Sequence, residues 1–220
     1  MTPSFSRFEA SCLSAAAVDR LAPAAERRLA TRLRKGATSE MPLEMRTCPG
    51  CGLEMPLSER SYDRKFYASA ECWSVFEEVL AVEFQNPVLF GQAHQLTVDT
   101  YAVQHAGGRH PDKSVCVHLV GLHLALERGV APVEVPRQLQ RLARRASWPH
   151  LEPPVERASL TVRDVALADP SHAHALRVRE WAAQVWRAWT PHHEIARHLA
   201  EDLVRYAERV VRRRQKAAGV

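Results

Sequence analysis

The sequence lacks the features that would place the protein in a membrane or send it out of the cell. None of its 220 residues belong to a run approaching the roughly 18 apolar residues of a membrane-spanning helix. The first residues do not form a basic segment followed by an apolar one, which is the pattern of a secretory signal. We therefore expect a cytoplasmic protein with no membrane segment.

The sequence also lacks a recognisable catalytic motif and has almost no strand pattern. No stretch alternates apolar and polar residues over the length of a strand, apart from the short Ser-Leu-Thr-Val at 159–162. The 46% hydrophobic and 25% charged residues are typical of an ordinary globular protein. These observations predict an all-α fold.

An excess of positive charge is present, but only at the two ends. The net charge is +3 for residues 1–47, +5 for residues 205–220 and −3 for the body between them. Solvated basic ends are the simplest interpretation, and an electrostatic contact with an acidic partner or a nucleic acid is the alternative. The body's own charge argues against nucleic-acid binding as the main function.

The order of these patterns predicts one domain with two appendages. Residues 1–45 are rich in Ala and Arg and read as an extension, with a helix at about 15–35. Residues 46–210 form the predicted metal-binding helical domain, which begins with an irregular segment at 46–71. Residues 211–220 are a basic tail.

Apolar residues with a helical period predict a bundle of about five to six helices after residue 71. Thr161 and Asp164 have the spacing of a capping box, which predicts the start of a further short helix. The main helices are expected at about 72–85, 88–105, 114–128, 139–146, 172–189 and 191–213.

Three of the five cysteines are spaced as metal ligands. Cys48 and Cys51 form a Cys-Pro-Gly-Cys-Gly knuckle, and Cys72 begins the first predicted helix. A Cys-x-x-Cys knuckle directs two thiolates at one ion, and a helix N-terminus favours the thiolate form of a third. In a reducing compartment this pattern indicates a metal rather than disulfides. We expect zinc, with iron as the alternative.

The fourth ligand is predicted from the lengths of the helices. Helices at 72–85 and 88–105 share a short turn, so they lie antiparallel and bring His105 to the level of Cys72. His94 is the competing ligand, about two turns farther away. His118, on the next helix, should also lie near this end. The expected ligands are Cys48, Cys51, Cys72 and His105, with His94 and His118 as alternates.

Other polar residues of the same helices are candidates for chemistry. His118, Tyr101 or Asp99 could transfer protons beside a metal-bound water. Asp99 and Gln104 could also fix a histidine tautomer. A second metal site from His174, His192 and His193 is a further hypothesis.

Several stretches together resemble an uncharacterised bacterial domain family of unknown function. They are CPGCGLEMP at 48–56, ECW at 71–73, HQLTVDTYAVQH at 94–105, VHLVGLHLALERG at 117–129 and the late WAAQVWRAWTPHH at 181–193. The resemblance covers roughly 48–200 and carries no known activity. It implies that three cysteines and five polar residues form one functional constellation: Cys48, Cys51, Cys72, His94, Asp99, Tyr101, His105 and His118.

Three functions follow, in decreasing order of support. The first is a zinc-binding helical domain with a Cys3His site and a structural, regulatory or interaction role, with a protein or acidic partner. The second is a metal-dependent enzyme with a partly open site. The third is nucleic-acid binding through the basic ends.

Overall fold

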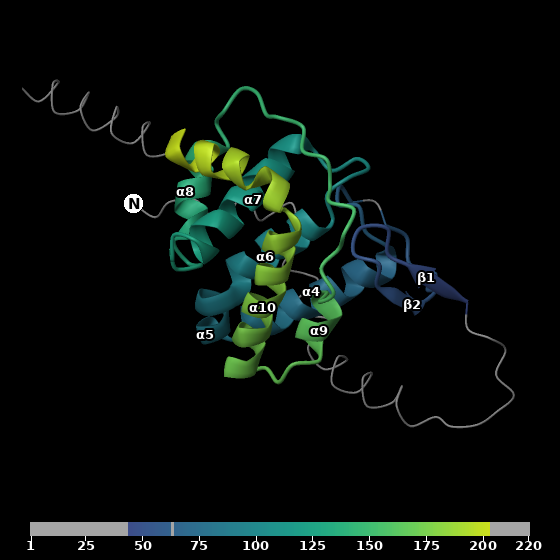
Figure 1. Ribbon diagram of the computed structural model, residues 1–220. Coiled ribbons are helices and arrows are strands. Elements are labelled where there is room, and N and C mark those ends of the chain that lie inside the picture. The colour runs from purple at the N-terminus through teal and green to yellow at the C-terminus, as the bar shows by residue number, and fades with distance from the viewer. Residues whose placement is uncertain (1–43, 63, 203–220) are drawn as a thin grey trace, which may run out of the picture. The chain divides into compact units, whose positions relative to one another are not determined.

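The computed structural model describes residues 44–62 and 64–202 (Figure 1). The chain divides into two units, residues 1–43 and 44–220, and the description concerns the second. The predicted extension, apart from its last two residues, and the predicted tail at 211–220 lie outside the described residues. The described part is mainly helical, as predicted, and none of its helices is long and apolar enough to cross a membrane.

Seven α-helices and one two-stranded sheet make up the described residues. The helix predicted at 88–105 is divided into α5 and α6, and the further short helix predicted after Thr161 is α9. The helices are α4 (Ala70–Gln85), α5 (Pro87–Leu89), α6 (Gln95–Gln104), α7 (Asp112–Leu126), α8 (Val135–Leu142), α9 (Val162–Ala166) and α10 (His172–Ala188). A π-helical turn at Phe90–His94 joins α5 to α6, and a 3-10 turn at Thr190–His192 precedes a helical segment at 193–202.

The segment predicted to be irregular begins with a β-hairpin. Strands β1 (Met45–Thr47) and β2 (Glu54–Pro56) pair antiparallel, with Arg46 opposite Met55. Five of their six residues are exposed, so the hairpin has little core of its own. Strands this short carry no readable alternation, which is why the sequence did not reveal them.

The only stretch that suggested a strand is instead the start of a helix. Thr161 is the N-cap of α9, and its side chain accepts a hydrogen bond from the backbone of Arg163. Asp164 accepts a hydrogen bond from the backbone N–H of Thr161 in return. The predicted capping box is therefore confirmed.

A single asparagine turns the chain between the first two long helical segments. Asn86 ends α4, and its side-chain oxygen accepts hydrogen bonds from the backbone of Val88 and Leu89, so it also caps α5. Pro87 occupies the first turn, where a missing N–H costs nothing. The following π turn ends on His94 and rotates its buried side chain relative to a regular helix.

Aromatic side chains fill the core between these helices. Phe76 of α4 stacks on Tyr101 of α6 with ring centroids 3.9 Å apart. Trp181 of α10 is fully buried, and its indole N–H donates to the side chain of Gln104 at 2.9 Å. Burial of a side chain of this size stabilises the fold by roughly 2–3 kcal/mol. These contacts fix α4, α6 and α10 around the end of α6, where His105 lies.

Candidate metal centre

The turn of the β-hairpin presents two cysteines on the same side. The Cys48 N–H donates to the Leu53 carbonyl at 2.8 Å, and the Gly52 N–H donates to the Cys48 carbonyl at 2.9 Å. Gly52 has a φ of +81°, which only glycine adopts without strain. The Pro-Gly-Cys-Gly sequence therefore forms the tight knuckle that a pair of metal thiolates requires.

The knuckle packs directly against the ring of the histidine. A Cβ atom on Gly50 would overlap the Tyr67 carbonyl oxygen and lie 2.6 Å from Cδ2 of His105. Only glycine allows this close approach of backbone and imidazole. Gly50 is therefore part of the construction of the site, although it contributes no ligand atom.

The third cysteine lies in the first turn of α4. Ser69 is the N-cap, and its hydroxyl accepts a hydrogen bond from the Cys72 N–H at 3.1 Å. The Cys72 sulfur lies 3.7 Å from the Cys51 sulfur and 3.3 Å from Nε2 of His105. A helix N-terminus stabilises a thiolate at this position.

The imidazole of His105 is held in one orientation by the chain itself. Its Nδ1 donates to the Tyr101 carbonyl at 2.8 Å, and its ring stacks on the Tyr101 ring with centroids 3.9 Å apart. The hydrogen bond leaves Nε2 as the free lone pair, facing the sulfurs. The sequence suggested that Asp99 or Gln104 would fix the tautomer of a metal-binding histidine, but for His105 a backbone carbonyl does so. The side chain of Gln104 instead forms hydrogen bonds with Leu160 and Trp181.

The four donors lie close enough together to share one metal ion. Their ligand atoms all lie within 4.8 Å of one another. Bonds of about 2.3 Å to sulfur and about 2.0 Å to nitrogen place tetrahedral ligand atoms about 3.5–3.8 Å apart. The measured separations of 3.7 and 3.3 Å are close to these values. All four side chains are at most 5% exposed: Cys48, Cys51, Cys72 and His105.

The thiols and the imidazole of the cluster shift one another's pKa values. Hydrogen bonds with Cys51 and Cys72 lower the pKa of Cys48, whereas hydrogen bonds with Cys48 and Cys51 raise the pKa of Cys72. Burial lowers the pKa of His105, but its contacts with the Cys48 and Cys51 sulfurs outweigh burial and raise that pKa to about 9. A divalent cation would let all three thiols ionise.

The alternate ligand His94 lies in a different buried cluster. Its Nδ1 donates to the Glu83 carboxylate at 3.0 Å. His174 and Thr97 donate to the other oxygen of the same carboxylate at 2.9 and 2.6 Å. These hydrogen bonds outweigh the effect of burial and hold the pKa of Glu83 below its usual value. Glu83 is therefore an anionic centre that joins α4, α6 and α10, and no motif had marked it.

The proposed proton-transfer residues divide between two places. Tyr101 lies at the metal centre, where its hydroxyl donates to the Cys72 sulfur at 3.7 Å. His118 and Asp99 instead bond each other, with Nδ1 of His118 2.7 Å from Oδ1 of Asp99. Burial raises the pKa of Asp99 despite this bond, and its second oxygen has no hydrogen-bond partner.

The histidines of the second metal hypothesis point to three different partners. His174 donates to Glu83, His192 to the Glu152 carbonyl at 2.8 Å and His193 to the Trp186 carbonyl at 2.8 Å. Among the residues that the structure describes, the Cys3His cluster is the one group of three or more His, Cys, Asp or Glu side chains that are close enough to share a metal ion.

A comparison with known families agrees with the resemblance found in the sequence. Residues 46–190 match a family of unknown function, DUF5946. The chain belongs to this family. The match begins at the hairpin and extends through α10, so it includes all four residues of the Cys3His cluster. Comparisons with curated proteins and with solved structures found no match.

Proposed function

We propose that the protein is a zinc-binding helical module, in which Cys48, Cys51, Cys72 and His105 hold one Zn²⁺ with a structural role. The observation that carries this proposal is the convergence of four buried donors within 4.8 Å of one another. Sulfur and imidazole donors in a tetrahedral arrangement favour zinc over hard cations such as Mg²⁺ or Ca²⁺.

The ligand count supports a structural rather than a catalytic ion. Three cysteines and one histidine complete a tetrahedral shell, whereas catalytic zinc sites usually have three protein ligands and an open position. The ion would join the hairpin, α4 and the end of α6. Because most hairpin residues are exposed, metal binding would supply stabilisation that apolar contacts do not. A regulatory or interaction role of the ordered hairpin belongs to the same proposal.

Metal analysis of the full-length protein, purified without added metal, tests the proposal. We expect one equivalent of zinc, and we expect X-ray absorption to show three sulfur neighbours and one nitrogen neighbour. His105→Ala should lose the metal, whereas His94→Ala should retain it because His94 bonds Glu83. Much less than half an equivalent of any transition metal in wild-type protein would overturn the proposal, and one equivalent of iron would overturn the choice of zinc.

A metal-dependent enzyme is the second candidate, and one observation favours it. The hydroxyl of Tyr101, one of the candidate proton-transfer residues, lies 3.7 Å from the Cys72 sulfur, where it would donate a proton beside the ion. Asp99 and His118 bond each other and not the cluster. An oxygen ligand in the X-ray absorption spectrum in place of one sulfur or nitrogen would support this candidate, and a complete Cys3His shell would contradict it.

A further inference from the structure

The helix α8 has a one-sided distribution of charge that neither the metal centre nor the core explains. Residues 135–149 contain four arginines and no acidic residue. Arg137, Arg141 and Arg144 recur at intervals of four and three, so they share one face of the helix and its C-terminal turn, and all three are exposed. The opposite face is buried through Val135, Leu139 and Leu142.

Within residues 44–62 and 64–202, these three arginines have no ion pair to offset their mutual repulsion. Among the described residues, the fourth arginine of the segment, Arg145, pairs with Asp202 at 2.6 Å, and Arg197 pairs with Glu127 at 2.7 Å. Like charges at neighbouring helix positions are destabilising. The remaining row of guanidinium groups is therefore suited to a ligand that carries regularly spaced negative charges.

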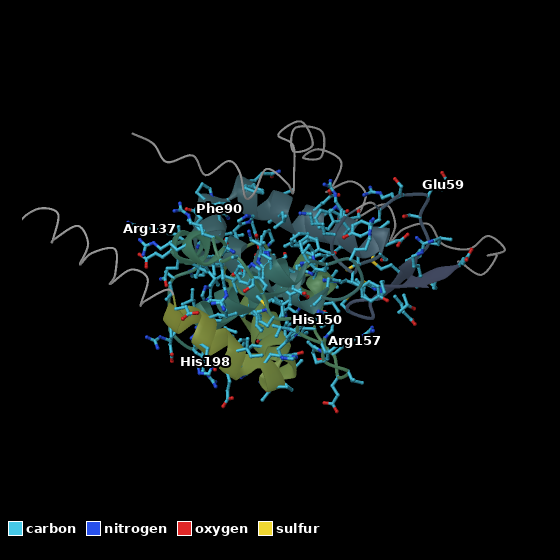
Figure 2. All side chains as sticks on the ribbon, turned by 90° about the horizontal axis from the view of Figure 1, so that it is seen from above. Glu59, Phe90, Arg137, His150, Arg157 and His198 are labelled. Carbon is cyan, nitrogen blue, oxygen red and sulfur yellow. The ribbon has the colours of Figure 1, made fainter. Side chains whose placement is uncertain are left out.

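The arginine row leads to an open hollow whose lining is partly apolar and partly polar, with Arg145 and Asp202 among its residues. The chain leaves α8 and passes through Arg145 to Trp148, which lines this hollow together with Ile195, His198 and Leu199. The hollow has a volume of about 360 Å³. In Figure 2, Arg137 and His198 lie on the same side of the molecule, and Glu59 of the segment after the hairpin lies on the other. The charged row and the hollow thus lie on the side away from the metal centre.

We propose that α8 and this hollow form a binding surface for single-stranded nucleic acid. Phosphates would pair with Arg137, Arg141 and Arg144, and an unpaired base would enter the hollow against Trp148. A row of cations beside an aromatic platform is the combination by which proteins bind single strands without strong sequence preference. The body's net charge of −3 does not oppose this assignment, because residues 135–149 carry four arginines and no acidic residue. The proposal is independent of the metal, because none of its residues belongs to the Cys3His cluster.

Fluorescence anisotropy with a labelled oligouridine of about 20 nucleotides tests the proposal on the full chain. The variant Arg137→Glu/Arg141→Glu/Arg144→Glu should weaken binding at least tenfold. Replacement of each cation removes about 0.7 from the slope of log K against log salt, so the slope should fall by roughly 2. The matched control, Arg163→Glu/Arg177→Glu/Arg179→Glu, reverses three exposed arginines of α9 and α10 and should bind as the wild type does.

A second variant separates base stacking from charge attraction. Trp148→Ala should weaken oligouridine binding about tenfold and leave binding of inorganic polyphosphate, which has no bases, unchanged. Thermal melts and zinc content of each variant confirm that the fold persists. Wild-type affinity in the α8 variant, or equal losses in both triple variants, would overturn the assignment of the surface. Equal losses of oligouridine and polyphosphate binding in Trp148→Ala would overturn the single-strand assignment in favour of polyanions in general, acidic proteins included.

Discussion

The substitution Gly50→Ala tests the construction of the metal centre without removing any ligand. The added methyl group would overlap the Tyr67 carbonyl oxygen and lie 2.6 Å from Cδ2 of His105, well inside ordinary van der Waals contact. Either the knuckle or the imidazole must then move. Forcing one methyl group into a closely packed site costs about 1–3 kcal/mol. For a chain of this size that cost corresponds to a fall in Tm of roughly 2–12 °C.

The prediction also concerns zinc affinity, because the displaced atoms belong to a ligand. We expect Gly50→Ala to bind zinc at least tenfold more weakly in a competition with a chromogenic chelator. Gly91→Ala is the matched control, since a Cβ at Gly91, in the π turn, would contact nothing within 4 Å. It should keep the wild-type Tm or slightly exceed it. If Gly50→Ala retained wild-type Tm and affinity, the packing of the knuckle against His105 would be wrong.

Three further substitutions test separate parts of the structure. Cys48→Ala removes a proposed ligand, so it should lower the Tm and make residues 46–71 accessible to protease while α6 and α7 remain protected. Proteolysis of the whole domain would contradict a local role for the metal. Glu83→Gln should cost about 1–3 kcal/mol at pH 7 in chemical unfolding, because its amide nitrogen cannot accept the hydrogen bonds that three buried donors make to the carboxylate. The folded-state pKa of Glu83 is lowered, so its stabilising effect is complete above the unfolded-state pKa of about 4.3. That effect is lost as the pH falls through the folded-state pKa. The difference in unfolding free energy between wild type and Glu83→Gln should therefore become smaller in acid. Gly121→Ala should destabilise the protein by about 1–3 kcal/mol, because its Cβ would lie 2.6 Å from Cγ of Asp99, and an unchanged melt would contradict that contact.

The grouping of Cys72 with His105 could be predicted from the sequence, because it depends on helix lengths and on the position of one turn. Helix lengths and the short turn at Asn86 determine which residues of α4 and α6 are level with each other. The arithmetic placed Cys72 beside His105, and the structure brings these two side chains together. Whether they bind a metal, and which one, is a property of the ion and not of helix geometry.

The parts that could not be predicted depend on tertiary contacts between unlike elements. Glu83 carries no motif, because its role arises only when His94 of the π turn and His174 of α10 meet the end of α4. The tautomer of His105 is fixed by a backbone carbonyl, which every residue possesses and no pattern distinguishes. Gly50 could have been recognised as a turn glycine, but its contact with the imidazole is a feature of packing alone.

The two ends of α4 are stabilised by different physical means. Cys72 lies in its first turn, and Glu83, eleven residues later, lies about 16 Å away along the helix at a rise of about 1.5 Å per residue. Glu83 is satisfied by protein donors from other helices, so that end needs no ion. At the Cys72 end the sulfurs have one another and a histidine as neighbours, and the mostly exposed hairpin contributes little apolar surface. The proposed cation would therefore act at one end of α4 and not at the other, which favours an ion that orders the hairpin rather than one that supports the helical core.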